Sequence, residues 1–328
     1  MSAPLLRVQG LKTYFRTRQG LVKAVDGVDL DVYPGECLGL VGESGSGKSV
    51  ALASVIGLVR NPGWIEAGTI QFAGRELTRL DEQAMRELRG KEIALIMQDA
   101  LTALNPAFTV ANQIIEVLAA HGEARDARRS KQALRAQAAE IMRLVGIPAA
   151  ESRLDDYPHQ FSGGMRQRIM IAIALACRPK LLIADEPTTA LDVTIQAQVL
   201  ELIAELRVRL GMSVVLITHD LGVVAEYCDR VAVMYAGQVV ETGPTREVIA
   251  DPKHPYTQGL LRSIPRLEHL DQAIEPIEGQ VPELVDLPDE CRFYGRCRHR
   301  QERCRTSIAM RTLPGTRQTR CILVGPGA

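Results

Sequence analysis

The octapeptide Gly42–Ser49, with the sequence G-E-S-G-S-G-K-S, most constrains what this chain can fold into. Its pattern G-x-x-x-x-G-K-S is that of a phosphate-binding loop. Glycines let the backbone turn tightly and bring its N–H groups close to a polyphosphate. Lys48 can then reach the outer phosphates, and the Ser49 hydroxyl can ligate Mg²⁺. We therefore expect phosphate and metal contacts from six residues of the loop: Gly42, Ser44, Gly45, Gly47, Lys48 and Ser49.

The segments on either side supply the context that such a loop needs. Residues 36–41 form a short apolar run suited to a buried strand, and residues 50–56 suit a helix. The positive N-terminal end of that helix would face the phosphates. A chance glycine-rich turn is the alternative, and the complete motif in this context disfavours it.

Three further predicted strands each run into polar residues. They are residues 93–97 before Gln98, 181–184 before Asp185 and Glu186, and 214–218 before His219. In an open α/β sheet, ligands bind at the carboxyl ends of the strands. Gln98 is well placed to reach a metal or a water there, and Asp185 suits the Mg²⁺ shell. Glu186 suits a base or an orienter of an attacking water, and the position of His219 favours a functional role over a structural one.

A second glycine motif, Ser162-Gly163-Gly164, precedes a predicted apolar helix over residues 169–177. Ser162 is a good N-cap residue, and a helix N-terminus opened by glycines is an anion site. Because Ser-Gly-Gly caps many helices, this motif is weak when it stands alone.

The remaining segments complete an α/β chain. Strands are predicted at 5–9, 22–25 and 28–32, hairpins at 65–80 and 231–241, helices at 109–145 and 194–209, and a loop at 98–106. Tyr14 and Phe15 lie among the first strands. An aromatic ring here could stack on adenine or could simply fill the core, and the sequence leaves both interpretations open.

From about residue 245 the composition changes, because prolines recur and the apolar periodicity fades. We expect a separate tail with little core of its own, and such segments usually need a bound metal or cluster to stabilise them. Four cysteines with the spacing C-x5-C-x6-C-x16-C fall here: Cys291, Cys297, Cys304 and Cys321. This spacing matches neither paired zinc motifs nor common ferredoxin patterns, so it indicates only four thiolates that could hold some metal. Five arginines lie near them in the sequence: Arg292, Arg296, Arg298, Arg303 and Arg305. They would offset the negative charge of such a cluster, and a solvated basic surface is the alternative.

Charge and hydropathy bear on partners and location. Lys plus Arg and Asp plus Glu both number 39, so no net charge attracts nucleic acid or an anionic membrane. No apolar run approaches the roughly 18–20 residues that span a bilayer. The first residues lack the features of a signal peptide, so we expect a cytoplasmic protein without a disulfide framework.

In their fixed order, these motifs strongly resemble the nucleotide-binding subunit of an ABC transporter, over residues 5 to about 325. In that resemblance Gln98 matches the Q-loop, Asp185 and Glu186 end the Walker B strand, and His219 matches the switch histidine. Residues 190–192 match the D-loop. Phe15 sits where the family has its adenine-stacking aromatic, with Tyr14 the alternative.

The signature motif of that family is matched by residues 162–165, with Phe161 where Leu is common and Met165 where Gln is common. These two departures put in doubt the site that this chain completes on a partner. The resemblance implies a P-loop NTPase core with an N-terminal antiparallel β subdomain, a helical subdomain at about 99–178 and a small cysteine-containing extension. It places the ATPase domain at 1–245 and the extension at 246–328.

Further motifs narrow the resemblance to the dipeptide and oligopeptide importer branch: residues 157–160, 184–198 and 254–257. The branch implies ATP and Mg²⁺ as ligands and a [4Fe–4S] cluster on the four cysteines, with Zn²⁺ as the alternative. Nickel, glutathione or another small solute are alternative cargoes.

The branch also implies a mechanism and partners. Two ATPases, usually different homologous chains, sandwich ATP head to tail between the phosphate loop of one and the signature motif of the other. Two integral membrane permease subunits hold them at the cytoplasmic face of the inner membrane, and an extracytoplasmic binding protein delivers the solute.

Other classes of ABC ATPase fit less well. Chromosome-maintenance types insert a very long coiled coil, whereas Ser162 follows Gln98 here by only 64 residues. Translation types carry two cassettes in tandem, and this chain has one. Intact Glu186 and His219 argue against a scaffold that does not hydrolyse nucleotide.

Overall fold

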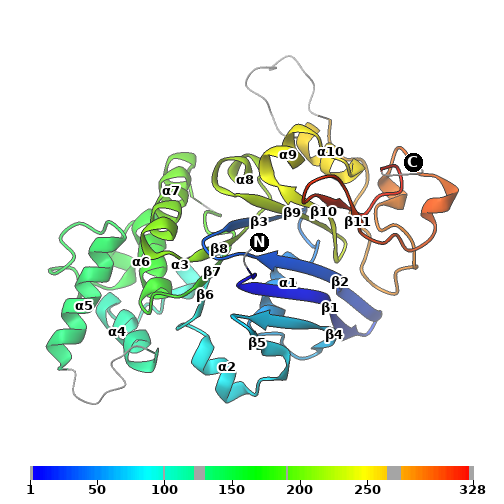
Figure 1. Ribbon diagram of the computed structural model, residues 1–328. Helices are drawn as coiled ribbons and strands as arrows, with labels where there is room; N and C mark the ends of the chain where they lie inside the picture. Colours follow the sequence, from blue (N-terminus) through cyan, green and yellow to red (C-terminus); the bar gives the residue numbers. More distant parts are fainter. Residues whose placement is uncertain (1–2, 99, 122–129, 190, 264–274, 325–328) are drawn as a thin grey trace. The chain divides into compact units, whose positions relative to one another are not determined.

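The computed structural model describes residues 3–98, 100–121, 130–189, 191–263 and 275–324. The chain divides into two compact units (Figure 1). Unit 1 combines Met1–Arg79 with Leu216–Ala328, and unit 2 is Leu80–Val215. Strand β8 (Ser213–Thr218) carries the chain from unit 2 back into unit 1.

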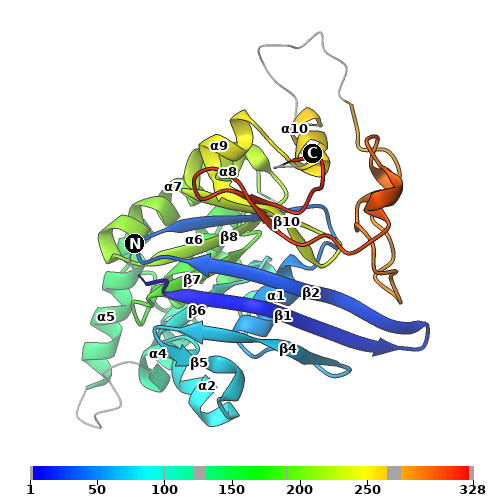
Figure 2. The ribbon, with the colours of Figure 1, turned by 45° about the vertical axis from the view of Figure 1, so that its right-hand side comes forward.

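Unit 1 begins with an antiparallel sheet in the order β2-β1-β4-β5. Its strands are β1 (Leu6–Thr17), β2 (Gly20–Val32), β4 (Gly63–Phe72) and β5 (Arg75–Glu76), followed by the 3₁₀ turn η1 (Leu77–Arg79). The long β1–β2 hairpin with β4 alongside is seen best in Figure 2. The predicted strands at 22–25 and 28–32 are both confirmed, but they form one continuous strand, since irregularities in the β1–β2 register interrupt its alternation.

The second sheet region of unit 1 contains the strand that leads into the phosphate loop. Strand β3 (Cys37–Val41) is entirely buried and pairs in parallel with β9 (Arg230–Tyr235). Strand β9 pairs with β10 (Gln238–Pro244), which confirms the predicted closing hairpin. The helices of this unit are α1 (Lys48–Val55), α8 (Leu221–Tyr227), α9 (Thr245–Ala250) and α10 (Pro255–Arg262).

The C-terminal extension adds two strands to this sheet. Strand β12 (Gln318–Thr319) pairs with β10, and β11 (Arg311–Thr312) pairs with β12. Strands of two residues carry no detectable alternation, so the sequence did not predict them. A small cluster of Cys304, Ile308 and Ile322 is the core of this segment. The extension therefore continues the sheet, and the predicted domain boundary at 245/246 stays a prediction.

Unit 2 is mainly helical. It contains α2 (Glu82–Leu88), β6 (Ile93–Ile96), α3 (Ala100–Ala103), α4 (Val110–His121), α5 (Lys131–Leu144), α6 (Gly163–Leu175), β7 (Leu181–Asp185) and α7 (Val193–Leu210). Strands β6 and β7 pair in parallel, and both predicted strands are confirmed. The predicted loop at 98–106 contains the single turn α3, and part of the predicted 109–145 helical region lies outside the described residues.

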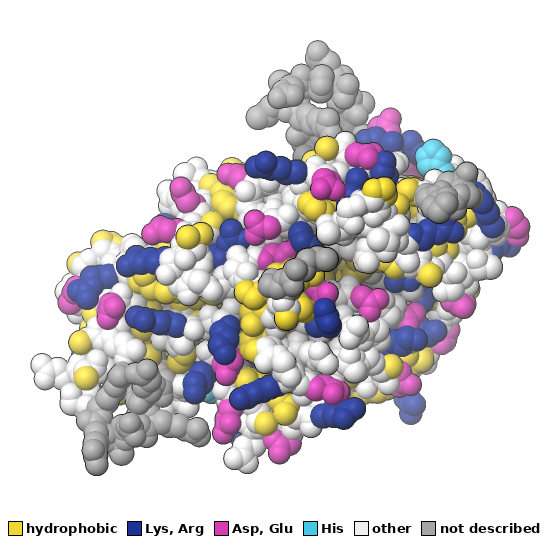
Figure 3. Space-filling view, viewed as in Figure 1, with side chains coloured by type: hydrophobic (Ala, Val, Ile, Leu, Met, Phe, Trp, Pro, Cys, Tyr) yellow, Lys and Arg dark blue, Asp and Glu magenta, His cyan; other side chains and the backbone are white. Residues whose placement is uncertain are grey.

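The hydropathy of the helices and the distribution of charged side chains can be read from the structure. Within the described parts of the chain, no helix combines the length and hydropathy needed to cross a membrane. Figure 3 shows positive and negative side chains interspersed on the face it presents, as the equal counts of charged residues would suggest.

Candidate functional site

The phosphate loop joins β3 to α1 and is shaped by glycines. Gly47 is the N-cap of α1 with φ 101°, and a Cβ there would lie 2.2 Å from the Ala24 carbonyl oxygen. A Cβ on Gly42 would lie 2.1 Å from the carbonyl oxygen of Met234. Both positions therefore exclude any side chain, which is the physical reason for glycine in this motif. The predicted strand, loop and helix are confirmed.

Lys48 lies along the inside of this loop. Its Nζ donates to the carbonyl oxygens of Gly42 at 2.7 Å and Glu43 at 3.0 Å, and approaches Ser46 Oγ at 3.3 Å. Ser44, Gly45 and Ser49 are exposed. The ammonium group thus shares one short loop with exposed residues that could receive a polyphosphate.

The two aromatic candidates on β1 have different surroundings. Tyr14 is buried, and its hydroxyl donates to Asp26 Oδ1 at 2.8 Å. Burial first, and then the Asp26 hydrogen bond, raises the pKa of Tyr14 well above its usual value. Phe15 is only half-buried and packs on Gly63, where an added Cβ would come within 2.4 Å of its ring. Tyr14 is therefore a core residue, whereas Phe15 is only partly covered.

His219 follows β8 and is exposed at the start of α8. The next residue, Asp220, caps that helix by accepting the Gly222 N–H at 2.7 Å. His219 and the phosphate loop both belong to unit 1.

The polar residues predicted at the ends of β6 and β7 come together within unit 2. Gln98 Nε2 donates to Glu186 Oε2 at 2.9 Å, and Thr189 Oγ1 donates to the same oxygen at 3.0 Å. Asp185 is the last residue of β7, and both acids are half-buried. Glu186 has φ 45°, a left-handed conformation that is strained for glutamate and concentrates at functional sites. The role of Thr189 could not be foreseen, because nothing in its spacing marks it.

The Ser-Gly-Gly motif opens α6 as predicted. Ser162 is the N-cap, and its Oγ accepts the Met165 N–H at 3.3 Å. Ser162 and Gly163 are exposed. A Cβ on Gly164 would lie 2.8 Å from the Ile195 side chain of α7, so the third residue serves helix packing. In the D-loop, Ala190 lies outside the described residues, and Asp192 caps α7.

Phe161 and Met165 share one partner, Arg153. The Arg153 guanidinium lies 4.0 Å from the centre of the Phe161 ring, and its Nη1 donates to Met165 Sδ at 3.7 Å. Its remaining nitrogens bind Asp156 Oδ2 and the Gln160 carbonyl oxygen. Arg153 thus contacts both Phe161 and Met165 at the first turn of α6.

The four cysteines of the extension line a common pocket. The pKa of Cys291 is raised to about 11, mainly by burial, and the neighbouring thiols of Cys304, Cys297 and Cys321 contribute to the same rise. Over the described residues, however, no three or more His, Cys, Asp or Glu side chains are placed to hold a metal ion. The thiols therefore share a pocket without closing into a set of ligands.

Two of the arginines near these cysteines pair with carboxylates of the N-terminal part of the chain. Arg292 Nη2 lies 2.5 Å from Asp26 Oδ2, and Arg296 Nη1 lies 2.6 Å from Glu43 Oε2. Sequence reasoning missed both pairs, because their members lie more than 250 positions apart in the chain.

Comparison with known proteins assigns the family. Residues 25–189 match the family model described as ABC transporter. The chain belongs to the ABC transporter family. Residues 240–304 of this ABC chain also match the model described as oligopeptide/dipeptide transporter, C-terminal region.

Relatives of this ABC chain extend over nearly its whole length. It is 49% identical to the dipeptide transport ATP-binding protein DppD of Haemophilus influenzae, over 97% of this chain and 94% of that protein. It is 47% identical to the DppD of Escherichia coli, over 97% and 96% of the two chains.

A solved structure shows the same cassette. The dimeric ATP-binding cassette MJ0796 bound to ADP and phosphate superimposes with a TM-score of 0.65 and 25% identity, over 74% of this chain and 99% of that one. The chain is therefore an ABC ATPase, and the predicted fold class and enzymatic class are confirmed.

Proposed function

We propose that this ABC ATPase drives the import of dipeptides or oligopeptides. Its close relatives are named for dipeptide transport, and its C-terminal segment matches a region described for oligopeptide and dipeptide transporters. The observation that carries the catalytic part is the Gln98–Glu186 hydrogen bond at the strand ends of unit 2. This hydrogen bond connects Glu186, the proposed base, to Gln98, which directly precedes the helical segment at about 99–178.

The proposed roles rest on the sequence motifs and on the resemblance to the ABC ATPase family. The phosphate loop binds the β- and γ-phosphates, with Lys48 as the cation and Phe15 stacking on the adenine. Ser49, Gln98 and Asp185 supply oxygen ligands of the kind that Mg²⁺ prefers, and the metal would neutralise phosphate charge. Glu186 accepts a proton from the attacking water, and His219 holds the γ-phosphate.

Ser162, Gly163 and Gly164 act on the ATP of a second subunit. The exposed start of α6 offers backbone N–H groups and a positive helix end to a γ-phosphate across a head-to-tail dimer. The second ATPase is proposed to be a homologous but different chain. ATP then joins the two chains, and hydrolysis releases them.

The partners follow from the proposed transport role. Two integral membrane permease subunits would dock on the helical segment at about 99–178, and an extracytoplasmic binding protein would present the solute. The chain would then sit peripherally at the cytoplasmic face of the inner membrane.

The cysteine pocket is proposed to hold a [4Fe–4S] cluster, with Zn²⁺ as the second candidate. The four thiols line one pocket, and thiolates are ligands of both groups, although the described side chains are not arranged as a ligand set. The cluster would stabilise a segment that has only a small core of its own. Anaerobic purification followed by iron, sulfide and zinc assays tests this: stoichiometric zinc would select the second candidate, and no metal would overturn both.

Reconstitution tests the transport role. The complete complex in lipid vesicles, given candidate binding proteins, should hydrolyse ATP faster when loaded with dipeptides. Stimulation by nickel or glutathione alone would replace the peptide assignment. No stimulation by any solute, with basal hydrolysis intact, would contradict an importer.

A further inference from the structure

An ion pair links the C-terminal extension to the phosphate loop. Arg296 Nη1 donates to Glu43 Oε2 at 2.6 Å, and its Nη2 donates to Glu43 Oε1 at 3.1 Å. Only 8% of the Arg296 side chain and 29% of the Glu43 side chain are exposed. This forked geometry is the strong form of an arginine–carboxylate pair, and both residues belong to unit 1.

A second contact from the extension holds the backbone of the same residue. The Glu43 N–H donates to the hydroxyl of Tyr256 at 2.9 Å. Tyr256 is fully buried and packs against Tyr235, with ring centres 4.5 Å apart, and against Phe293, at 5.5 Å. Both the side chain and the amide of Glu43 are thus fixed by residues that follow position 245.

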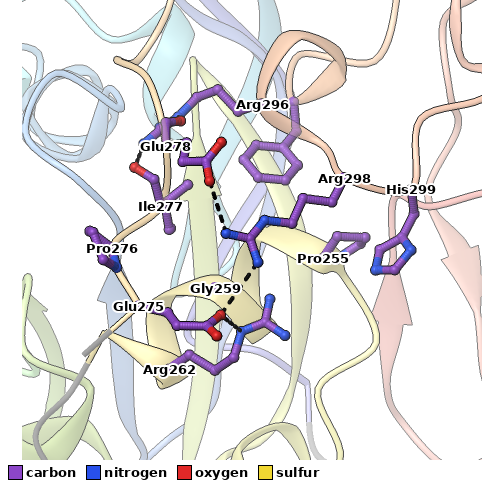
Figure 4. A pocket seen from close by; sticks show the side chains of 11 residues that line it. Pro255, Gly259, Arg262, Glu275, Pro276, Ile277, Glu278, Arg296, Arg298 and His299 are labelled. Carbon is purple, nitrogen blue, oxygen red and sulfur yellow. Dashed lines mark hydrogen bonds and ion pairs between the residues drawn. The ribbon is translucent and has the colours of Figure 1, made fainter. Parts of the chain in front are cut away.

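The guanidinium of Arg296 is held from its other side. Its Nε donates to the Glu278 carbonyl oxygen at 2.9 Å, and Nη2 also reaches the Ile277 carbonyl oxygen at 3.2 Å. Figure 4 shows Arg296 with these two residues on the wall of a pocket. Because its nitrogens are engaged on both sides, Arg296 can transmit the position of the extension to Glu43.

Glu43 in turn supports the lysine of the loop. Its carbonyl oxygen accepts Lys48 Nζ at 3.0 Å and the Ser46 N–H at 3.2 Å. A displacement of Glu43 would therefore move the groups that orient Lys48.

We propose that Arg296 is a positioning residue for the phosphate loop, through which the C-terminal extension sets the affinity of this ATPase for ATP. The proposal rests on the phosphate loop binding ATP. It gives the extension a role in nucleotide binding that is separate from any group held by its cysteines.

Titration of the full-length protein with MgATP tests this role. Arg296→Gln should weaken binding about tenfold, which corresponds to about 1.4 kcal/mol. Glu43→Gln should have a similar effect, and the double variant should be no weaker than the worse single variant, because both remove one interaction. Arg296→Lys should fall in between, since lysine keeps the charge and loses the fork.

Arg298→Gln is the matched control. Arg298 follows closely in the chain but is 56% exposed and pairs with Glu275 and Glu278, as Figure 4 shows. This variant should bind MgATP like the wild type. The thermal midpoint of each variant without nucleotide separates loss of fold from loss of affinity.

Three outcomes would decide against the proposal. Wild-type affinity in folded Arg296→Gln would overturn it, as would additive effects in the double variant. A lower thermal midpoint with unchanged affinity would reduce Arg296 to a structural role.

A failure of the proposed nucleotide site itself is recognised separately. If the wild type does not bind MgATP, and Lys48→Ala behaves identically, the proposed nucleotide site is wrong.

Discussion

Individual residues of this ABC ATPase adopt backbone conformations that are unfavourable for most side chains. Gly47 has φ 101° and no room for a Cβ, whereas Gly45 has φ 78° with open space around it. Glu186 accepts a left-handed conformation, φ 45°, and its carboxylate is oriented by Gln98 and Thr189. The phosphate loop therefore carries a steric requirement, and the proposed base carries backbone strain.

The two loop glycines give a prediction about steric fit. Gly47→Ala should lower the free energy of unfolding by more than about 2 kcal/mol, because strain and a carbonyl contact add. Gly45→Ala, which meets no atom within 4 Å, should lower it by only about 1 kcal/mol. Urea denaturation without nucleotide measures both values. Equal losses would contradict the steric argument.

Single strand ends could be predicted, since a buried apolar run followed by a polar residue is a local pattern. The Gln98–Glu186 contact follows from two such patterns on neighbouring strands. The Arg296–Glu43 pair could not be predicted, because Arg296 is one of several arginines in the tail and nothing local marks its partner.

At the scale of secondary structure elements, contacts from outside α6 hold the first turns of this helix. Arg153 joins Phe161 and Met165 at the first turn of α6, and Gln167 of the same helix donates to the Pro187 carbonyl oxygen beyond β7. The sequence predicted the strand and the helix from their apolar patterns. It missed the irregular register of β1 with β2 and the two-residue strands of the extension, which have no periodicity to detect.

The Arg153 contacts give a prediction for α6. Arg153→Leu should lower the free energy of unfolding by about 1–2 kcal/mol, because the ring contact and three hydrogen bonds are lost together. Arg143→Leu is the control: it removes only an ion pair with Glu151 whose side chains are both more than half exposed, and should cost under about 0.5 kcal/mol. Denaturant titration compares them, and equal costs would show that Arg153 does not stabilise the motif.

On the scale of the whole molecule, the extension is joined to the rest of unit 1 by buried charges as well as by strand pairing. Glu241 of β10 is fully buried, and its carboxylate accepts Arg317 Nη2 at 3.2 Å and the backbone N–H groups of Lys253 and His254. Burial lowers the pKa of His254 to about 3, so this histidine is neutral near pH 7. We therefore expect the extension to unfold together with the core of unit 1.

Arg317→Met tests that expectation. Leaving Glu241 without its cation should lower the free energy of unfolding by about 3 kcal/mol. The single tryptophan, Trp64, reports from β4 of the same unit, so its fluorescence transition should move to lower denaturant. Arg305→Met, whose exposed partner is Glu302, should leave it unchanged. An unmoved Trp64 transition in Arg317→Met would mean that the extension unfolds independently.

Single-turnover hydrolysis by Glu186→Gln, assembled with the proposed second ATPase, tests the central claim most directly. Glutamine keeps a similar shape and loses the proton acceptor, so MgATP affinity should stay within about twofold while hydrolysis falls at least about 100-fold, the range expected for a general base. Hydrolysis at the wild-type rate, with ATP bound normally, would contradict the assignment of Glu186 and the account of the site built on it.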